Sequence, residues 1–293
     1  MIIIRDEFAA AEIHPDRGAA VGRYDIVLPG GESWAIFQTS PDPGRAGPYA
    51  LGLNLLIPFS NRISGGGFWH DGAFHRLERN TAGPFPVHGN AFAMAWTVRE
   101  TTATSATLDL HSGGPGPFRY DATVTYSLFA GALRTRLVVA NLSSTSLPFG
   151  AGLHPWFVRT AETLLTTRTA GYWTETPDHL PDQFIVTRDD PEFDFSRPKR
   201  LPAMPMNTAF TGWEREATLA WADRKLAVDI TATEPLTTLI VYSPSGASDF
   251  VCIEPVSHSV DAHNRAGPGT APPQILEPGA ALTLDATIRP YPI

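Results

Sequence analysis

Two side chains stand out as candidates for acid and base chemistry, His154 and Glu254. His154 and Trp156 flank a proline, which favours an extended backbone and so directs both side chains to one face. An indole stacks on the apolar face of a sugar ring, and an imidazole exchanges protons near neutral pH. Glu254 ends an otherwise apolar strand pattern, where a carboxylate is costly unless it is paired or functional. The pattern predicts a sugar-like site at His154 and a functional Glu254.

Arg62 and His88 lie in two further polar clusters, and each has two interpretations. Arg62 follows an apolar run at residues 53–59, so we expect it to be partly buried. A buried guanidinium needs acceptors, which either a structural salt bridge or a ligand can supply. His88, between Val87 and Gly89, fits a core position as well as a site. The glycines at 65–67 lack the Lys-Ser/Thr of a phosphate loop and indicate a connection between strands.

Four potential metal ligands occur within ten residues, namely Glu254, His258, Asp261 and His263. The intervening proline, serines and asparagine do not favour a helix that would align them, so we expect no metal site. Cys252 shares a strand face with Glu254 but has no adjacent basic residue, which indicates a packing role. It is the one cysteine of the chain, so an intramolecular disulfide is excluded.

The elements that must position these residues are predicted to be strands. Apolar residues alternate with polar ones over residues 120–128 and, after Ala130-Gly131, over 133–140, which predicts an antiparallel hairpin. Similar patterns occur at 106–110, 226–230, 239–242 and 281–288. Loops are expected at residues 39–48, 112–117, 174–181, 189–205 and 265–273. The absence of helical periodicity favours an all-β fold, a large antiparallel β-sandwich.

Length and charge narrow the function. The 293 residues contain no obvious linker or internal repeat, so we expect a single domain over residues 1–293. The formal net charge is −8 with lysine only at Lys199 and Lys225, which disfavours nucleic acid and polyanionic substrates. The sequence has no signal-peptide pattern and no apolar run of membrane-spanning length. We therefore expect a cytoplasmic protein, monomeric or homodimeric, that does not engage membranes.

Several short motifs, in this order, resemble the aldose 1-epimerase (galactose mutarotase-like) family between about Asn54 and Asn264. They are Asn61-Arg62-Ile63 with Phe68 and Asp71-Gly72; His88-Gly89 with Trp96; His154-Pro155-Trp156-Phe157; Phe210-Thr211-Gly212-Trp213; and Glu254-Pro255 with Asp261-Ala262 and Asn264.

The resemblance implies a galactose mutarotase-like supersandwich that acts on a monosaccharide without metal or organic cofactor. His154 would be the general acid that protonates the ring oxygen, and Glu254 the general base that deprotonates the anomeric hydroxyl. Arg62 and His88 match positions that hold substrate oxygens. Asn207 stands where family members often have an acidic residue, and Trp156 where Tyr or Phe is usual. These two departures concern which sugar is bound, and we include both residues among the substrate contacts.

Three functions therefore remain open. The first is a mutarotase that interconverts the α and β anomers of a free aldose, including a hexose phosphorylated or sulfonated at C6. The second is a non-catalytic sugar-binding domain, which would not need both His154 and Glu254. The third is a glycoside hydrolase or lyase, which usually requires two carboxylates, whereas only Glu254 lies in a convincing site.

Overall fold

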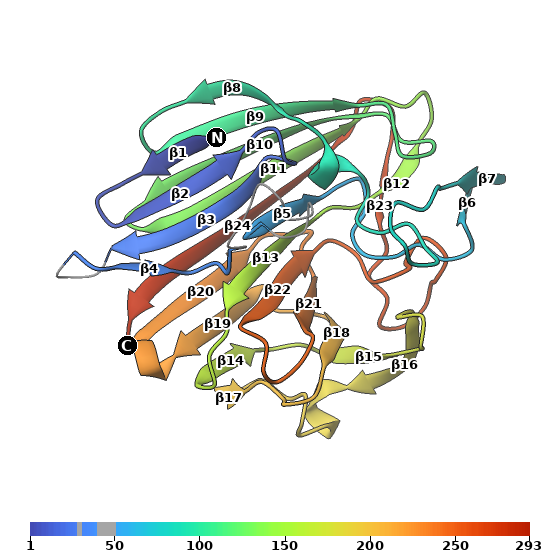
Figure 1. Cartoon of the computed structure of the whole chain (residues 1–293). Coiled ribbons are helices and arrows are strands. Elements are labelled where there is room, and N and C mark those ends of the chain that lie inside the picture. Colours follow the sequence, from blue (N-terminus) through green and yellow to red (C-terminus); the bar gives the residue numbers. More distant parts are fainter. Residues whose placement is uncertain (28–30, 40–50) are drawn as a thin grey trace.

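The computed structural model describes residues 1–27, 31–39 and 51–293, and consists almost entirely of antiparallel strands (Figure 1). An 11-stranded sheet follows the order β1 (Ile2–Arg5), β2 (Ala9–His14), β3 (Ala20–Val27), β5 (Leu53–Leu56), β13 (Gly152–Val158), β22 (Phe250–Val256), β21 (Thr238–Ser243), β18 (Met206–Thr211), β15 (Gly171–Glu175) and β16 (Pro181–Val186), with β4 (Ser33–Ala35) paired to β3.

A 9-stranded sheet follows the order β17 (Lys199–Arg200), β14 (Thr163–Thr167), β19 (Glu216–Trp221), β20 (Leu226–Ala232), β24 (Ala281–Pro292), β11 (Ala132–Asn141), β10 (Tyr120–Phe129), β9 (Ser105–Ser112) and β8 (Thr97–Thr101). Two small ribbons pair β12 (Leu147–Phe149) with β23 (Gln274–Leu276) and β6 (Gly67–His70) with β7 (Ala73–Arg76). Helical structure in the described residues is limited to three 3₁₀ turns, η1 (Ala91–Ala93), η2 (Thr187–Asp189) and η3 (Ala222–Arg224).

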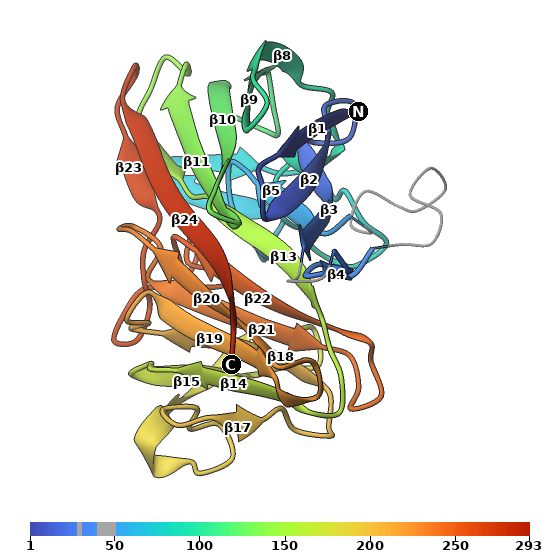
Figure 2. The same ribbon diagram turned by 90° about the vertical axis from the view of Figure 1, so that its left-hand side faces the viewer.

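The two large sheets pack face to face around one core, to which strands of both contribute (Figure 2). Along β10, Tyr120, Val124 and Tyr126 are buried while Asp121 is exposed, so one face of this strand packs inward. The Tyr126 hydroxyl donates to the carbonyl of Ala19 at 2.9 Å, which satisfies a polar group inside the core. The predicted all-β sandwich is confirmed.

The strand predictions match the structure where alternation was clear. The predicted hairpin is β10–β11, paired from Tyr120↔Asn141 to Phe129↔Ala132. The other predicted strands lie within β9, β20, β21 and β24. Of the predicted loops, residues 189–205 contain the short strand β17, and residues 174–181 narrow to a turn at 176–180 between β15 and β16. The loop predicted at 39–48 lies, apart from Thr39, outside the described residues.

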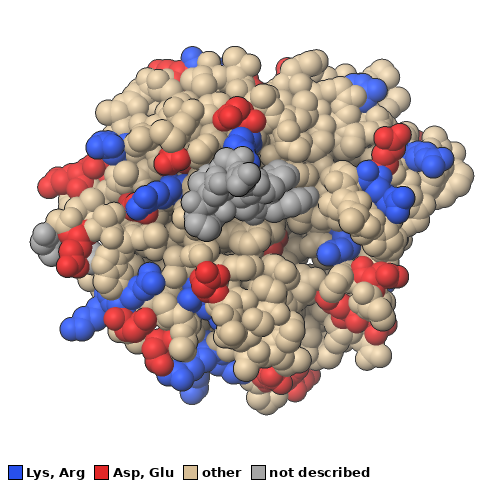
Figure 3. Space-filling model, in the orientation of Figure 1, with Lys and Arg blue, Asp and Glu red and all other residues tan. Residues whose placement is uncertain are grey.

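Charges on the surface are mixed. On the face in Figure 3, basic and acidic side chains are interspersed rather than gathered by sign. In the part of the chain that the structure describes, no helix is long and apolar enough to cross a membrane.

The central strands of the 11-stranded sheet are buried on both faces. In β13, Leu153 and Phe157 belong to the core, while His154 and Trp156 point to the other face of the sheet. In β22, Val251 and Ile253 are likewise core residues. Loops cover part of the second face, and a cavity opens there.

Candidate active site

A cavity of about 480 Å³ lies on the second face of the 11-stranded sheet. All six residues that the sequence marked as catalytic or substrate-binding line it, namely Arg62, His88, His154, Trp156, Asn207 and Glu254. Asn61, Thr81, Gly83, Val87, His179 and Tyr242 complete the wall. Residues far apart in the sequence thus meet in a space of the size that small-molecule sites usually have.

The register of the strands explains why these side chains converge. β13 and β22 pair Gly152↔Val256 and Trp156↔Cys252, so His154 and Glu254 lie opposite one another between these pairs. Directly paired residues point to the same face of a sheet. The next pairs, Cys252↔Tyr242 and Tyr242↔Asn207, continue the Trp156 row across β21 and β18. The sheet therefore provides the cavity floor.

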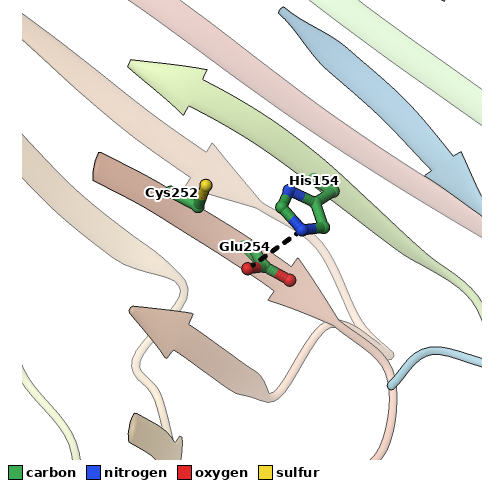
Figure 4. A group of neighbouring side chains, drawn as sticks. All are labelled: His154, Cys252 and Glu254. Atoms are coloured by element: carbon green, nitrogen blue, oxygen red, sulfur yellow. Dashed lines mark ion pairs between the residues drawn. The ribbon is translucent and has the colours of Figure 1, made fainter. Parts of the chain in front are cut away.

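His154 and Glu254 form a close, buried pair. His154 Nε2 lies 3.4 Å from Glu254 Oε1, and their side chains are only 8% and 3% exposed. Figure 4 shows the imidazole projecting from β13 toward the carboxyl group on β22. Among the described residues, neither His154 Nδ1 nor Glu254 Oε2 has a hydrogen-bond partner. Buried polar atoms are rarely left unpaired, so the pair has hydrogen-bonding capacity that the described residues do not satisfy.

Burial also sets the protonation of this pair. Burial raises the pKa of Glu254 to about 8, against an opposing effect of the Arg62 charge. Burial lowers the pKa of His154 to about 4. Both shifts have the same cause, since a low-dielectric environment disfavours whichever form is charged. Between these values the pair holds one proton, which resides on Glu254 in the unliganded site.

Arg62 is oriented by its neighbour Asn61. The Asn61 side-chain oxygen accepts from the Arg62 backbone N–H at 2.9 Å and from Arg62 Nη1 at 3.0 Å. Asn61 adopts a left-handed backbone with φ of 54°, which asparagine tolerates better than most residues. Arg62 lines the cavity, and the Asn61 amide fixes the orientation of its guanidinium group.

His88 has a defined tautomer. Its Nδ1 accepts from the backbone N–H of Asn61 at 2.9 Å, so the proton of the neutral ring resides on Nε2. Burial, then the charges of His154 and Arg62, hold the pKa of His88 well below its usual value. The ring lies edge-on to His154, with centroids 5.4 Å apart. His88 therefore presents a neutral N–H donor rather than a cation.

Trp156 and Asn207 occupy different parts of the wall. The indole of Trp156 stacks on the His154 ring at 17° and 5.5 Å, and packs against Phe250 at 4.5 Å. Asn207, on β18, is half-buried, and its amide nitrogen lies 3.4 Å from Nδ1 of His179.

Sequence reasoning did not identify His179 or Tyr242 as wall residues. Tyr242 lies on a predicted strand, and its alternation with the buried Val241 would have placed it on the cavity face. His179 lies within a predicted loop, and no local signal distinguishes it. Only the pairing of β15 with β18 brings that loop to the cavity.

Of the four potential metal ligands considered from the sequence, only Glu254 belongs to a group of described side chains that could hold a metal. His258 and His263 are already engaged: His258 Nε2 accepts from the Ser60 N–H, and His263 Nε2 lies 2.9 Å from the carbonyl of Pro148. In the described residues, His154, Cys252 and Glu254 instead bring one ligand atom each to within 4.8 Å of one another (Figure 4). Burial and Glu254 raise the pKa of the Cys252 thiol, which disfavours the thiolate that a metal requires.

Residues 48–289 match the family model for aldose 1-epimerase. The chain belongs to the aldose 1-epimerase family. YphB of Escherichia coli, described as uncharacterized, is 29% identical over 256 residues, covering 84% of this chain and 87% of YphB. YihR of the same organism, also described as uncharacterized, is 25% identical over 248 residues, covering 81% of this chain and 75% of YihR.

Two solved structures share the fold over nearly their whole length. A proposed aldose 1-epimerase from Escherichia coli K12 superposes with a TM-score of 0.89 at 24% identity, covering 99% of this chain and 98% of its own. A galactose mutarotase-like protein from Clostridium acetobutylicum gives 0.86 at 17% identity, with coverages of 99% and 95%. At these identities the likeness concerns the fold alone.

Proposed function

We propose that this protein is a mutarotase that interconverts the α and β anomers of a free aldose. The observation that carries the proposal is the His154–Glu254 pair, which is buried and lies at the wall of a cavity of suitable size for a monosaccharide. Ring opening requires a proton to leave the anomeric hydroxyl and another to reach the ring oxygen, and these oxygens are bonded to the same carbon. Two proton carriers 3.4 Å apart match that requirement.

The two protonation states of the pair correspond to the two forms of the sugar. With the proton on His154, the imidazolium protonates the ring oxygen while the Glu254 carboxylate takes the anomeric proton, and the C1–O5 bond breaks. The open aldehyde then meets neutral His154 and protonated Glu254. After rotation about C1–C2, Glu254 returns its proton to the carbonyl oxygen while His154 takes the proton from the O5 hydroxyl, and the ring closes on the opposite face. Atoms and charge balance without a covalent intermediate.

The unliganded pair is in the state that suits the open sugar, because burial keeps the proton on Glu254. A cyclic sugar supplies hydrogen-bond partners to the charged state, in which Glu254 is ionised and His154 is protonated. The anomeric hydroxyl donates to the carboxylate, and the ring oxygen accepts from the imidazolium. Arg62 already favours ionised Glu254. We infer that substrate oxygens complete this stabilisation, and that His88 and Arg62 donate to sugar oxygens away from the reacting carbon.

A neutral aldose fits the cavity better than a sugar with an anionic C6 substituent. Among the described wall residues, Arg62 is the only fixed cation, and His88 is held neutral. A phosphate or sulfonate would depend largely on Arg62, whose charge already acts on Glu254. Hydrogen bonds from neutral groups suit hydroxyls instead.

The test is exchange between the anomeric NMR signals of aldoses, phosphosugars and sulfosugars. Glu254→Gln keeps the size of the side chain but removes its basicity, and is expected to slow exchange roughly 100- to 10,000-fold. His154→Asn is expected to lower kcat more than it raises KM. Glu100→Gln, on the exposed strand β8, is the matched control and should behave as wild type. An unchanged rate in Glu254→Gln would show that this carboxyl group is not the base.

A further inference from the structure

A histidine–glutamate pair, distinct from His154 and Glu254, lies at the rim of the cavity. It belongs to the turn between β15 and β16, where His179 Nδ1 lies 2.8 Å from Glu175 Oε2. His179 also lines the cavity. Its side chain is 52% exposed and that of Glu175 is 29% exposed, so this pair lies where the cavity meets solvent.

The backbone holds His179 in a fixed and unusual conformation. Its φ is 60°, in the left-handed region that residues with a side chain seldom adopt. The His179 N–H donates to the carbonyl of Thr176, and the Thr176 N–H donates to the carbonyl of Leu180, each at 2.9 Å. Strained backbone conformations of this kind persist where surrounding hydrogen bonds enforce them, and they are enriched at ligand sites.

Glu175 determines which ring nitrogen of His179 faces a ligand. A carboxylate only accepts hydrogen bonds, so at 2.8 Å the imidazole proton lies on Nδ1 and is donated to Glu175. Nε2 of the neutral ring is then an acceptor. The Asn207 amide, 3.4 Å from Nδ1, lies beside the ring on the cavity wall. The rim thus combines an imidazole acceptor with a carboxamide that both donates and accepts.

The position of this rim matches the far side of a sugar ring. Asn207 lies on β18, two strands beyond the Glu254 strand β22 in the order β22-β21-β18. Neighbouring strands are about 4.8 Å apart, which places β18 roughly 10 Å from β22. A pyranose bound with C1 and O5 at the His154–Glu254 pair extends across β21, and its opposite edge then approaches Asn207 and His179.

We propose that His179, oriented by Glu175, is a specificity-determining residue that accepts a hydrogen bond from one hydroxyl on the sugar edge opposite the anomeric carbon. This inference rests on the proposed function, because it uses the sugar orientation that the His154–Glu254 pair implies. His179 binds the substrate, Glu175 is its positioning residue, and neither takes part in proton transfer at C1.

The experiment combines enzyme variants with substrates that lack single hydroxyls. KM and kcat are measured by anomer exchange, and Kd by ligand-observed NMR, for D-glucose, D-galactose and their monodeoxy analogues. We expect His179→Ala to raise KM and Kd about tenfold for the better parent sugar, with kcat within about twofold, as for loss of one hydrogen bond. For one deoxy analogue, which lacks the hydroxyl that His179 binds, wild type and His179→Ala should have equal KM and equal Kd.

Glu175→Gln tests the positioning role. Glutamine keeps the contact to Nδ1 but permits the other tautomer, so KM should rise less than in His179→Ala. The double variant should have the same KM and Kd as His179→Ala alone, since Glu175 acts through His179. The matched control is His111→Ala, which removes an exposed histidine that pairs with Asp121 at 2.6 Å on the other sheet. This control should leave KM and kcat unchanged.

The outcomes that overturn the inference are distinct from failure of the proposed function. An equal effect of His179→Ala on every analogue, or a fall in kcat at constant KM, excludes a specificity role. If wild type binds these sugars without exchanging their anomers, mutarotase activity on them is excluded while the Kd values still test His179. If none of these sugars binds to wild type, both proposals are wrong for aldohexoses.

Discussion

The His154–Glu254 pair combines two neutral side chains that would both be charged in water near pH 6. Burial raises the pKa of Glu254 to about 8 and lowers that of His154 to about 4. Anomer exchange requires one acid and one base, and therefore one proton on the pair. Above pH 8 this proton is lost and the site has a base without an acid. Below pH 4 a second proton is gained, and the site has an acid without a base.

We therefore expect a bell-shaped pH profile of kcat/KM, with limbs near pH 4 and pH 8 and a plateau between them. The measurement is anomer exchange by NMR with buffer-catalysed exchange subtracted at each pH. In Glu254→Gln, the residual rate should lose the limb near pH 8, because no group with that pKa remains in the pair. A wild-type rate that continues to rise above pH 9 would contradict the assignment.

Whether an element could be predicted from the sequence depends on how many of its faces are buried. β10 has one buried face, so its alternation revealed the strand to within one residue. β13 and β22 are buried on both faces and show no alternation, since the cavity replaces solvent on their second side. In these two strands, the sequence signal for a site was a polar residue in an apolar segment, namely His154 in β13 and Glu254 in β22. Their pairing came from the family resemblance, and the structure adds the register that makes them opposite.

Contacts between distant loops had no sequence signal. His179 reaches the cavity because β15 pairs with β18, and nothing in residues 174–181 encodes that partner. The conformation of the Arg62 loop is a second example. Asp261 Oδ1 and Oδ2 accept from the backbone N–H and hydroxyl of Ser64, each at 2.8 Å, and the Asp261 N–H donates to the Arg62 carbonyl at 3.1 Å. These contacts join segments about 200 residues apart.

Asp261→Ala is expected to loosen this loop while leaving the strands of the His154–Glu254 pair in place. The change removes three hydrogen bonds, two from Ser64 and one from Asn264, at a side chain that is almost fully buried, so the free energy of unfolding should fall by about 2–3 kcal/mol. KM should rise more than kcat falls, because Arg62 contacts substrate away from the reacting carbon. Denaturant unfolding and exchange kinetics measure the two effects.

Asp121→Ala is the control for that variant, because the Asp121 side chain is exposed and, in the described residues, bonds only to the His111 ring. Its stability should stay within about 0.5 kcal/mol of wild type. If Asp261→Ala lowered kcat without changing KM, the loop would have to orient the reacting groups rather than the bound sugar.

The raised pKa of the Glu254 carboxyl group makes the stability of the whole molecule depend on pH. One core cluster joins both large sheets, so we expect the 293 residues to unfold in a single transition. In the unfolded chain Glu254 titrates near its ordinary pKa of 4.5, whereas in the folded chain it titrates at about 8. Between these values the folded state binds more protons, so stability falls as the pH rises. Below pH 4.5 both states are protonated, and this contribution to stability is fully present.

Glu254→Gln removes this titration and should gain stability relative to wild type as the pH rises. Each pH unit between 4.5 and 8 changes the difference in unfolding free energy by up to about 1.4 kcal/mol, and above pH 8 the difference is constant. Titrating groups remote from the His154–Glu254 pair are common to both proteins, so their contributions cancel in this difference. Denaturant unfolding at pH 5, 6.5, 8 and 9 measures it. A difference independent of pH would mean that folded Glu254 titrates normally, and would remove the physical basis for a proton shared with His154.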